Sequence, residues 1–345
     1  MAKIDELLRL MLEHNASDLH ISVGNPPILR INGQLHRTKF HDLTSRETEV
    51  LLMELLDEEN TTLLKARKDI DLAYELPNEG SFRSNIYYEN EGLGAAFRLI
   101  PSTIKTLDDL NMPAALKRLV RNRKGLVLVT GPTGSGKSTT LAAMIDVINR
   151  ERACHIITLE DPIEFIHPKG KALIHQRQVG IHVESFASGL RAGLREDPEV
   201  ILVGEMRDLE TIHLALTAAE TGLLVFGTLH TSSVIKTTDR IVDVFPADQQ
   251  PQVRMMLSES LQGVVAQQLL RRADGAGRIA AIEIMICTRA IRNLLREGKA
   301  FQITSVLQTG TSLGMQTMEG HLQQLVEKKL ITPEEASTIM PNSEH

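Results

Sequence analysis

The stretch Gly131-Pro132-Thr133-Gly134-Ser135-Gly136-Lys137-Ser138 decides the fold of the larger part of this chain. The apolar run Leu126–Val129 precedes it, and residues 139–145, which read as a helix, follow it. A strand, a glycine-rich turn and a helix N-terminus in this order are the context that a phosphate-binding P-loop requires. A chance glycine-serine turn is the alternative, and it leaves both flanks unexplained. The sequence therefore predicts that a nucleoside triphosphate binds here.

Each residue type in this turn has a physical reason to be there. Gly131 and Gly136 allow backbone angles that a side chain would block, so successive N–H groups can point at phosphate oxygens. The following helix adds the positive end of its dipole, and we assign Thr139 to the nucleotide-binding set as well. Lys137 is expected on the β- and γ-phosphates, and the Ser138 hydroxyl on Mg²⁺. The predicted ligands are therefore ATP and Mg²⁺.

Length and composition narrow the class of protein. A chain of 345 residues suggests two domains, each large enough for its own core. The formal net charge of −6 gives no general attraction to polyanions, so we expect no nucleic acid partner. The N-terminus carries acids where a signal peptide would be basic and then apolar. No apolar run approaches the roughly 18 residues that span a bilayer. We expect a cytoplasmic protein whose membrane association is peripheral.

The N-terminal third has the patterns of a small α+β domain. Apolar residues of 4–13 share one helical face, and a second helix is expected at 45–56. Strand-like pieces at 70–76, 82–88 and 94–100 are separated by turn residues, and Asn32-Gly33 is a hairpin signal. We predict a mostly antiparallel sheet in residues 1–101, a linker at 102–113 and a second domain at 114–345. Taken alone, Arg83 and Arg98 read as ordinary strand residues.

Polar residues follow three apolar strands in the middle of the chain. His155–Leu159 ends in Glu160-Asp161-Pro162-Ile163-Glu164, Val200–Gly204 ends in Glu205, and Leu224–Leu229 ends in His230. Short apolar strands alternating with helices indicate a parallel sheet covered on both faces, and functional groups collect at the carboxyl ends of such strands.

These polar residues fit phosphoryl transfer. The reaction needs a group that orients the attacking water and an acid that holds Mg²⁺, directly or through water. Helix capping by Asp161 or Glu164 is the plain alternative for either residue, and a structural role is the alternative for His230. As a sensor of the γ-phosphate, His230 would report hydrolysis to the rest of the molecule.

The last part of the chain is predicted to be mainly helical. Gln249–Leu270 reads as one long amphipathic helix, and Ile279–Ile286 as a strand. Helices are expected at 288–297, 300–308 and 317–329, with a short one from Pro333. The charged residues of 289–299 read as a solvated helix face.

These motifs together resemble the secretion ATPase superfamily, whose members drive type II secretion and type IV pili. The resemblance rests on the P-loop, the box Thr158–Glu164, the strand ending in Glu205 and the box Thr228–Thr231, in this order. Within the superfamily the chain is similar to the pilus retraction ATPases over residues 3 to 340. Its stretch Ala290–Glu297 resembles a motif associated with retraction.

The resemblance implies a fold and a set of roles. The fold would be a PAS-like N-terminal domain followed by a RecA-like ATPase domain with C-terminal helices, assembled as a homohexamer. By similarity, Glu164 is the general base, Glu205 positions Mg²⁺ through water, and His230 couples the nucleotide state to domain motion. Arg83 and Arg98 fall where the family's N-terminal domain supplies arginines to the phosphates. The implied partners are further copies of this chain, the inner-membrane platform protein at the pilus base and a second retraction ATPase.

Two departures bear on the branch of the family. Leu223 stands where retraction ATPases commonly carry a histidine, which leaves open a divergent paralogue that acts as an accessory retraction ATPase. Extension and type II secretion ATPases usually add an N-terminal region and a four-cysteine zinc element, whereas this sequence has two cysteines in all. A nucleic-acid motor on the same core is the rival from another class. A GTPase is disfavoured because the sequence contains no Asn-Lys-x-Asp motif.

Overall fold

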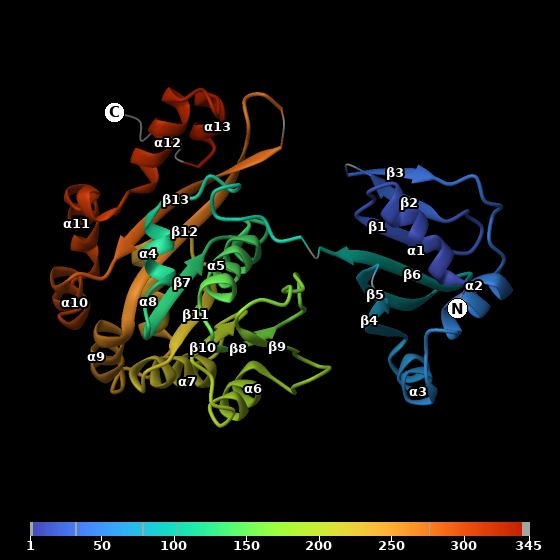
Figure 1. The fold of residues 1–345 in the computed structure, drawn as a ribbon, viewed down its shortest axis with the longest axis horizontal. Coiled ribbons are helices and arrows are strands. Elements are labelled where there is room, and N and C mark those ends of the chain that lie inside the picture. The colour runs from blue at the N-terminus through green and yellow to red at the C-terminus, as the bar shows by residue number, and fades with distance from the viewer. Residues whose placement is uncertain (1–2, 32, 78, 102, 276, 340–345) are drawn as a thin grey trace. The chain divides into compact units, whose positions relative to one another are not determined.

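The computed structural model describes residues 3–31, 33–77, 79–101, 103–275 and 277–339. Contacts between residues divide the chain into two compact units, Met1–Thr103 and Ile104–His345 (Figure 1). Asn32 of the expected hairpin lies outside the described residues. Within the described ranges, no helix is long and apolar enough to cross a membrane.

The first unit is an α+β domain. Its elements are α1 (Ile4–Glu13), β1 (Asp18–Ile21), β2 (Ile28–Ile31), β3 (Gln34–Arg37), α2 (Ser45–Met53), α3 (Glu58–Arg67), β4 (Asp69–Leu76), β5 (Gly80–Glu89) and β6 (Gly92–Ile100). In the described part of the chain, six strands form a sheet in the order β3-β2-β1-β6-β5-β4, and every neighbouring pair is antiparallel. The antiparallel sheet predicted from the sequence is confirmed.

Alternating burial explains this sheet. Along β4, exposed and half-buried residues alternate, as they do when one face meets the core and the other meets water. The core beneath it includes Leu8 and Met11 of α1 and Phe82 and Phe97 of the sheet. The helix expected at 45–56 ends at Met53, and α3 was not predicted because Leu64 is its one fully buried residue.

The second unit carries the P-loop. Its elements are α4 (Ala115–Val120), β7 (Gly125–Thr130), α5 (Lys137–Glu151), β8 (His155–Glu160), β9 (Leu173–Gln178), α6 (Phe186–Gly193), β10 (Val200–Val203), α7 (Leu209–Glu220), β11 (Leu224–Leu229), α8 (Val234–Asp243), α9 (Gln250–Ser260), β12 (Leu261–Arg271), β13 (Arg278–Ile286), α10 (Arg289–Arg296), the 3₁₀ turn η1 (Ala300–Gln302), α11 (Ile303–Thr309), the 3₁₀ turn η2 (Thr311–Leu313), α12 (Met318–Glu327) and α13 (Pro333–Ser337).

A mixed sheet organises this unit in three layers. Within the described ranges, seven strands run in the order β13-β12-β7-β11-β10-β8-β9, and only the β12–β13 pair is antiparallel. Both faces are covered, so every residue of β7 is buried. Leu126 and Leu128 pack with helices α6 to α10, whereas Val127 and Val129 pack with α4 and α5. The parallel α/β core predicted from the apolar strands is confirmed.

The long helix expected over Gln249–Leu270 is wrong. Helix α9 ends at Ser260, and β12 follows directly, pairing with β7 on one side and β13 on the other. Val264, Val265 and Ala266 of β12 are fully buried. A strand buried on both faces shows a continuous apolar run rather than alternation, and periodicity cannot separate such a run from a buried helix.

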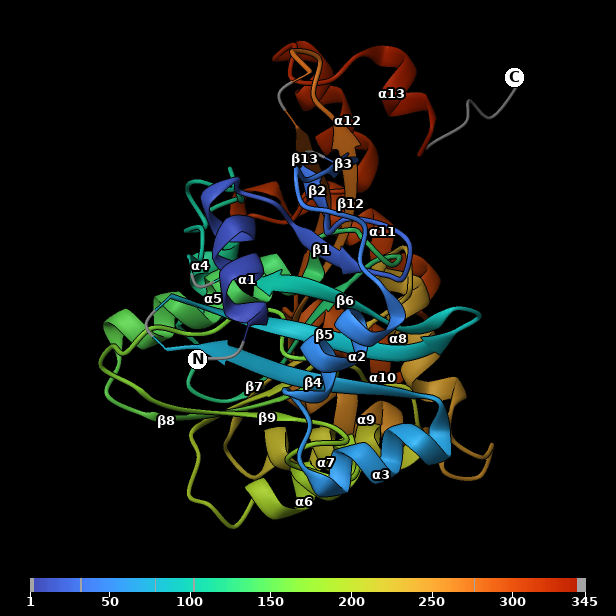
Figure 2. The ribbon, with the colours of Figure 1, turned by 90° about the vertical axis from the view of Figure 1, so that its right-hand side faces the viewer.

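The C-terminal helices pack at the far end of the β12–β13 pair. Leu270 and Ile279 of this pair form a small core with Leu322 and Leu325 of α12. The backbone N–H of Arg271 donates to Glu335 of α13 over 2.8 Å. Figure 2 shows the two strands rising together toward α12 and α13. The helices expected at 288–297, 300–308 and 317–329 are present with small shifts of their ends.

Candidate active site

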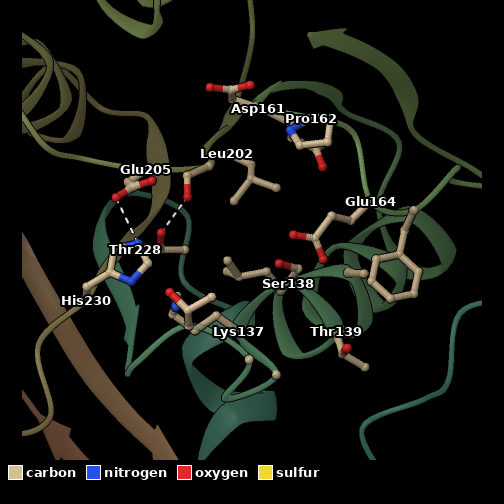
Figure 3. Close-up of a pocket in the computed structure, with 18 of the residues that line it drawn as sticks. Lys137, Ser138, Thr139, Asp161, Pro162, Glu164, Leu202, Glu205, Thr228 and His230 are labelled. Atoms are coloured by element: carbon tan, nitrogen blue, oxygen red, sulfur yellow. Dashed lines mark hydrogen bonds and ion pairs between the residues drawn. The ribbon is translucent and has the colours of Figure 1, made fainter. Parts of the chain in front are cut away.

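A cavity of about 520 Å³ lies in the second unit at the carboxyl ends of its strands. The P-loop and helix α5 form one wall, and the segments that follow β8, β10 and β11 form the other (Figure 3). The residues predicted from the sequence that line it are Thr133, Gly134, Gly136, Lys137, Ser138, Thr139, Glu164, Glu205 and His230. Gly131, Pro132 and Ser135 belong to the same turn without lining the cavity. The sheet therefore brings together side chains from four separate stretches of sequence.

The P-loop backbone depends on its glycines. Gly131, Gly134 and Gly136 all have positive φ, at +148°, +77° and +86°. A Cβ on Gly131 would come within 2.2 Å of the Gln267 carbonyl oxygen, so that position admits no side chain. Gly136 is also the N-cap of α5, where its left-handed conformation turns the chain into the helix. The turn is thus shaped for close approach of a ligand to backbone N–H groups.

Lys137 bonds to the loop that carries it. Its Nζ donates to the carbonyl oxygens of Gly131 at 2.9 Å and of Pro132 at 3.1 Å. Burial lowers the pKa of this ammonium, and the nearby carboxylates of Glu205 and Glu164 oppose that shift. The site therefore holds a positive charge that is partly removed from water, next to two acids.

Gln267 holds the P-loop from behind and was not found from the sequence. Its Nε2 donates to the Ser135 carbonyl oxygen at 2.6 Å, and its Oε1 accepts from the Thr140 hydroxyl at 2.8 Å. Gln267 is 1% exposed, so these two bonds satisfy a side-chain amide that cannot form hydrogen bonds with solvent. Because the sequence placed Gln267 in a helix rather than in β12, nothing pointed to this contact.

Glu205 lies against the side chains of His230 and Arg207. His230 Nε2 is 2.8 Å from Glu205 Oε1, and Arg207 Nε forms an ion pair with the same oxygen. The bond to Glu205 raises the pKa of Arg207. Arg207 was missed because it lies beyond the strand end that drew attention to Glu205.

A further bond connects the ends of β10 and β11. The Thr228 hydroxyl donates to the carbonyl oxygen of Gly204 (Figure 3).

The carboxylates after β8 do different things. Figure 3 shows the side chain of Glu164 pointing into the cavity, and that of Asp161 pointing away from the P-loop. Glu160 accepts from the Thr158 hydroxyl at 2.6 Å and from Gln176 Nε2 at 3.2 Å. Burial raises the pKa of the Glu160 carboxyl. Of these three acids, Glu164 is the one whose side chain points toward the P-loop side of the cavity.

The two arginines singled out in the first unit face one another. Arg83 of β5 and Arg98 of β6 are direct cross-strand partners. Arg98 Nε lies 2.7 Å from Asp18 Oδ1, and an Arg83 guanidinium nitrogen lies 3.6 Å from Asp71 Oδ1. Like charges directly opposite each other destabilise a sheet, and these aspartates offset the repulsion. Arg30 also approaches Asp18, at 3.6 Å.

Leu223 occupies an apolar position. It lies just before β11 and packs against the core on the α7 side of the sheet. Its carbonyl oxygen accepts the Gly125 N–H at 2.9 Å, which closes the start of β7. The leucine is thus accommodated by packing.

The P-loop, the acidic strand ends and the covered sheet define the class of protein. They define a P-loop ATPase, in which the glycine-rich turn and acidic side chains from neighbouring strand ends share one cavity.

Comparison with known proteins narrows the class to a family. The model of the Type II/IV secretion system protein family matches residues 1–343, and the chain belongs to this family. It is 52% identical over 333 residues to the type IV pilus retraction ATPase PilT of Pseudomonas aeruginosa, covering 96% of each chain. It is 38% identical to the type IV pilus ATPase PilU of the same organism, covering 97% of this chain and 87% of PilU.

A solved structure agrees with this assignment. The crystal structure of the pilus retraction motor PilT with bound ADP superimposes with a TM-score of 0.92 at 45% identity. The match covers 99% of this chain and 98% of that one. The fold predicted from the sequence is therefore confirmed along almost the whole chain.

Proposed function

We propose that this chain is a motor ATPase that hydrolyses ATP to power the retraction of type IV pili. The observation that carries the proposal is the 52% identity to the pilus retraction ATPase PilT, which extends over 96% of both chains. The cavity supports it, because it contains the parts that ATP hydrolysis needs.

The P-loop residues 131–139 are proposed to bind the nucleotide. Backbone N–H groups of the turn and the N-terminus of α5 would receive the phosphates. Lys137 donates to the carbonyl oxygens of Gly131 and Pro132, so hydrogen bonds to the turn hold its ammonium in place. A charge held in place needs little reorganisation when phosphate oxygens reach it.

The oxygen donors in the cavity fit Mg²⁺. Ser138 supplies a hydroxyl and Glu205 a carboxylate, and this hard cation prefers oxygen ligands. Ser138 would bind the ion directly, and Glu205 would act through a water molecule. When bound, Mg²⁺ would neutralise charge on the phosphate oxygens.

Glu164 and His230 are proposed to act at the γ-phosphate. The Glu164 carboxylate points into the cavity, where it can orient and deprotonate the attacking water. His230 lies against Glu205, with 2.8 Å between Nε2 and Oε1. A change of His230 partner on nucleotide binding would couple the nucleotide state to motion of the strand end that carries it. Arg83 and Arg98 of the first unit are proposed to reach the phosphates.

The proposed assembly is a homohexamer at the pilus base. The inner-membrane platform protein would be its mechanical partner, and a second retraction ATPase would work beside it. The chain would be cytoplasmic and attached peripherally to the inner membrane. The identity of 52% to PilT against 38% to PilU favours the primary retraction motor over the accessory one.

Replacement of the proposed base tests the chemistry. Glu164→Gln keeps the shape of the side chain but removes its basicity, so ATP binding should persist while steady-state turnover falls at least about 100-fold. Glu184→Gln is the matched control, because Glu184 is exposed and does not line the cavity. Turnover of the Glu164 variant at the control's rate would refute the assignment.

Deletion of the gene tests the biological role. Loss of a retraction motor should leave cells with many pili that do not retract, and a plasmid copy should restore retraction unless it carries Glu164→Gln. Cells without pili would instead identify an extension motor and contradict the proposal.

A further inference from the structure

Strand β9 presents two glutamines to the segment that carries Glu164. Gln176 and Gln178 are two residues apart, so they share one face of the strand. Gln176 Nε2 donates to the Phe165 carbonyl oxygen at 2.8 Å, and Gln176 Oε1 accepts the His167 N–H at 2.9 Å. One amide group thus binds the segment 161–167 through both of its ends.

Three further bonds fix the same segment. Gln178 Oε1 accepts the Ile163 N–H at 3.3 Å, on the near side of Glu164. Gln176 Nε2 also donates to Glu160 at 3.2 Å, and the same Glu160 carboxyl accepts the backbone N–H of Glu164. Backbone groups on both sides of Glu164, and its own N–H, are therefore bound by residues of β8 and β9.

The side chain of Glu164 has no comparable support. In the described part of the chain, no residue hydrogen-bonds to its carboxylate, which is exposed in the cavity. A catalytic group must be held within a fraction of an ångström of its productive position. The hydrogen bonds that fix the position of Glu164 are therefore those made by its own backbone and by the backbone of its neighbours.

We propose that Gln176, acting with Glu160 and Gln178, is a positioning residue that holds Glu164 in place for attack of water on ATP. The inference rests on the proposed role of Glu164. Gln176 does not line the cavity and so acts without touching the nucleotide. Its contribution is to the geometry of the reaction rather than to binding.

Gln176→Met is the direct test. Methionine has similar length but cannot form these hydrogen bonds, so the segment 161–167 loses its two backbone bonds to Gln176 and keeps only the bond to Gln178. The expected result is a fall in kcat of about 10- to 100-fold with KM for ATP and ADP affinity changed less than about threefold. His175→Leu is the matched control on the same strand, because His175 bonds to His155 rather than to the segment. A kcat of Gln176→Met equal to that of the control overturns the inference.

A double mutant separates positioning from general structural damage. If Gln176 acts through Glu164, adding Gln176→Met to Glu164→Gln should lower the residual single-turnover rate no further. A full additional loss would mean that Gln176 acts independently of Glu164, against the inference. If Glu164→Gln alone hydrolyses ATP normally, the proposed base is wrong, and that failure is distinct from a normal rate in Gln176→Met.

A milder variant covers the case in which Gln176→Met does not fold. Gln178→Met removes only the bond to Ile163 and should lower kcat less, about 3- to 10-fold, again with unchanged nucleotide affinity. An unchanged kcat in this folded variant would contradict the inference that side chains of β9 position the segment 161–167.

Discussion

The two sheets of this molecule are built on different principles, and the difference decides where chemistry can gather. In the first unit, antiparallel β4 alternates between exposed and half-buried residues. In the second unit, β7, β10 and β11 are buried at every position. An antiparallel sheet sends successive strand ends to opposite edges, whereas parallel strands deliver all their carboxyl ends to one edge. The P-loop, Glu164, Glu205 and His230 meet for this reason.

The first unit brings charges together in another way. Arg83 and Arg98 lie opposite each other through strand register rather than at a common edge. Each is balanced by an aspartate of its own unit, Asp71 or Asp18. Both guanidinium groups of the first unit thus lie beside an acid of the same unit. The second unit instead presents charged side chains in a cavity.

Removal of the P-loop ammonium should have the largest effect. Lys137→Ala deletes the charge that the loop carbonyls hold in the cavity, together with its hydrogen bonds to phosphate. Charge-assisted bonds of this kind contribute about 3 kcal/mol, so ATP affinity should fall about 100-fold. Fluorescent nucleotide binding measures this effect. Affinity within threefold of the wild type would show that the second unit does not bind phosphate through Lys137.

The arginine pair should have a smaller effect, confined to turnover. If these groups reach the phosphates, Arg83→Gln or Arg98→Gln should lower kcat about 10-fold or more without changing the oligomeric state of the protein. Arg30→Gln is the control, because Arg30 also approaches Asp18 and tests the loss of that ion pair alone. Steady-state hydrolysis and light scattering provide the two readouts. Normal turnover in both arginine variants would return the first unit to a purely structural role.

Mild acid should destabilise the second unit through a buried histidine of α12. His321 Nδ1 accepts the Ile282 N–H at 2.9 Å, and burial lowers the pKa of this imidazole from 6.5 to about 4. The unfolded chain therefore takes up a proton before the folded chain does. The contribution of neutral His321 to the free energy of unfolding is therefore fully present above pH 6.5, and it declines as the pH falls toward 4.

The predicted size of this decline is small. It amounts to about 1.4 kcal/mol at a pH of about 5.5, because this pH is about one unit below 6.5 and one pKa unit corresponds to about 1.4 kcal/mol. His321→Asn keeps an acceptor without titrating, so the loss of stability on acidification should shrink by this amount. Urea unfolding of the variant and the wild type above pH 6.5 and at a pH of about 5.5 measures this change in the free energy of unfolding. Parallel pH profiles of variant and wild type would contradict the assignment to His321.

The features that could be predicted are those with a local signature. The P-loop carries its own pattern, and Glu205 and His230 stand at the ends of apolar strands that sequence alone reveals. Residues that act across the fold could not be found. This group comprises Gln176, Gln267 and Arg207. Their contacts are with residues far along the chain or lie beyond a strand end, and no pattern in the sequence predicts such contacts.

The wrong prediction over Gln249–Leu270 has one physical cause. An apolar run buried on both faces fits either a helix or a central strand, and only its pairing with β7 and β13 selects the strand. That single error hid Gln267 as well, because its neighbours were placed on a helix. The alternating strands of the first unit contained no such ambiguity, and their positions were predicted within a few residues.

The placement of Gln267 on β12 has a mechanical consequence. Four residues beyond it, the backbone of Arg271 bonds to α13, while Gln267 itself bonds to the P-loop turn. An extended strand covers about 13 Å over this length, at about 3.3 Å a residue. Continuous pairing with β13 from Gln267 to Arg271 keeps this part of β12 from bending freely. The segment Gln267–Arg271 of β12 thus connects the P-loop turn to helix α13. We expect a displacement of either one to move the other, because no loop interrupts the strand between them.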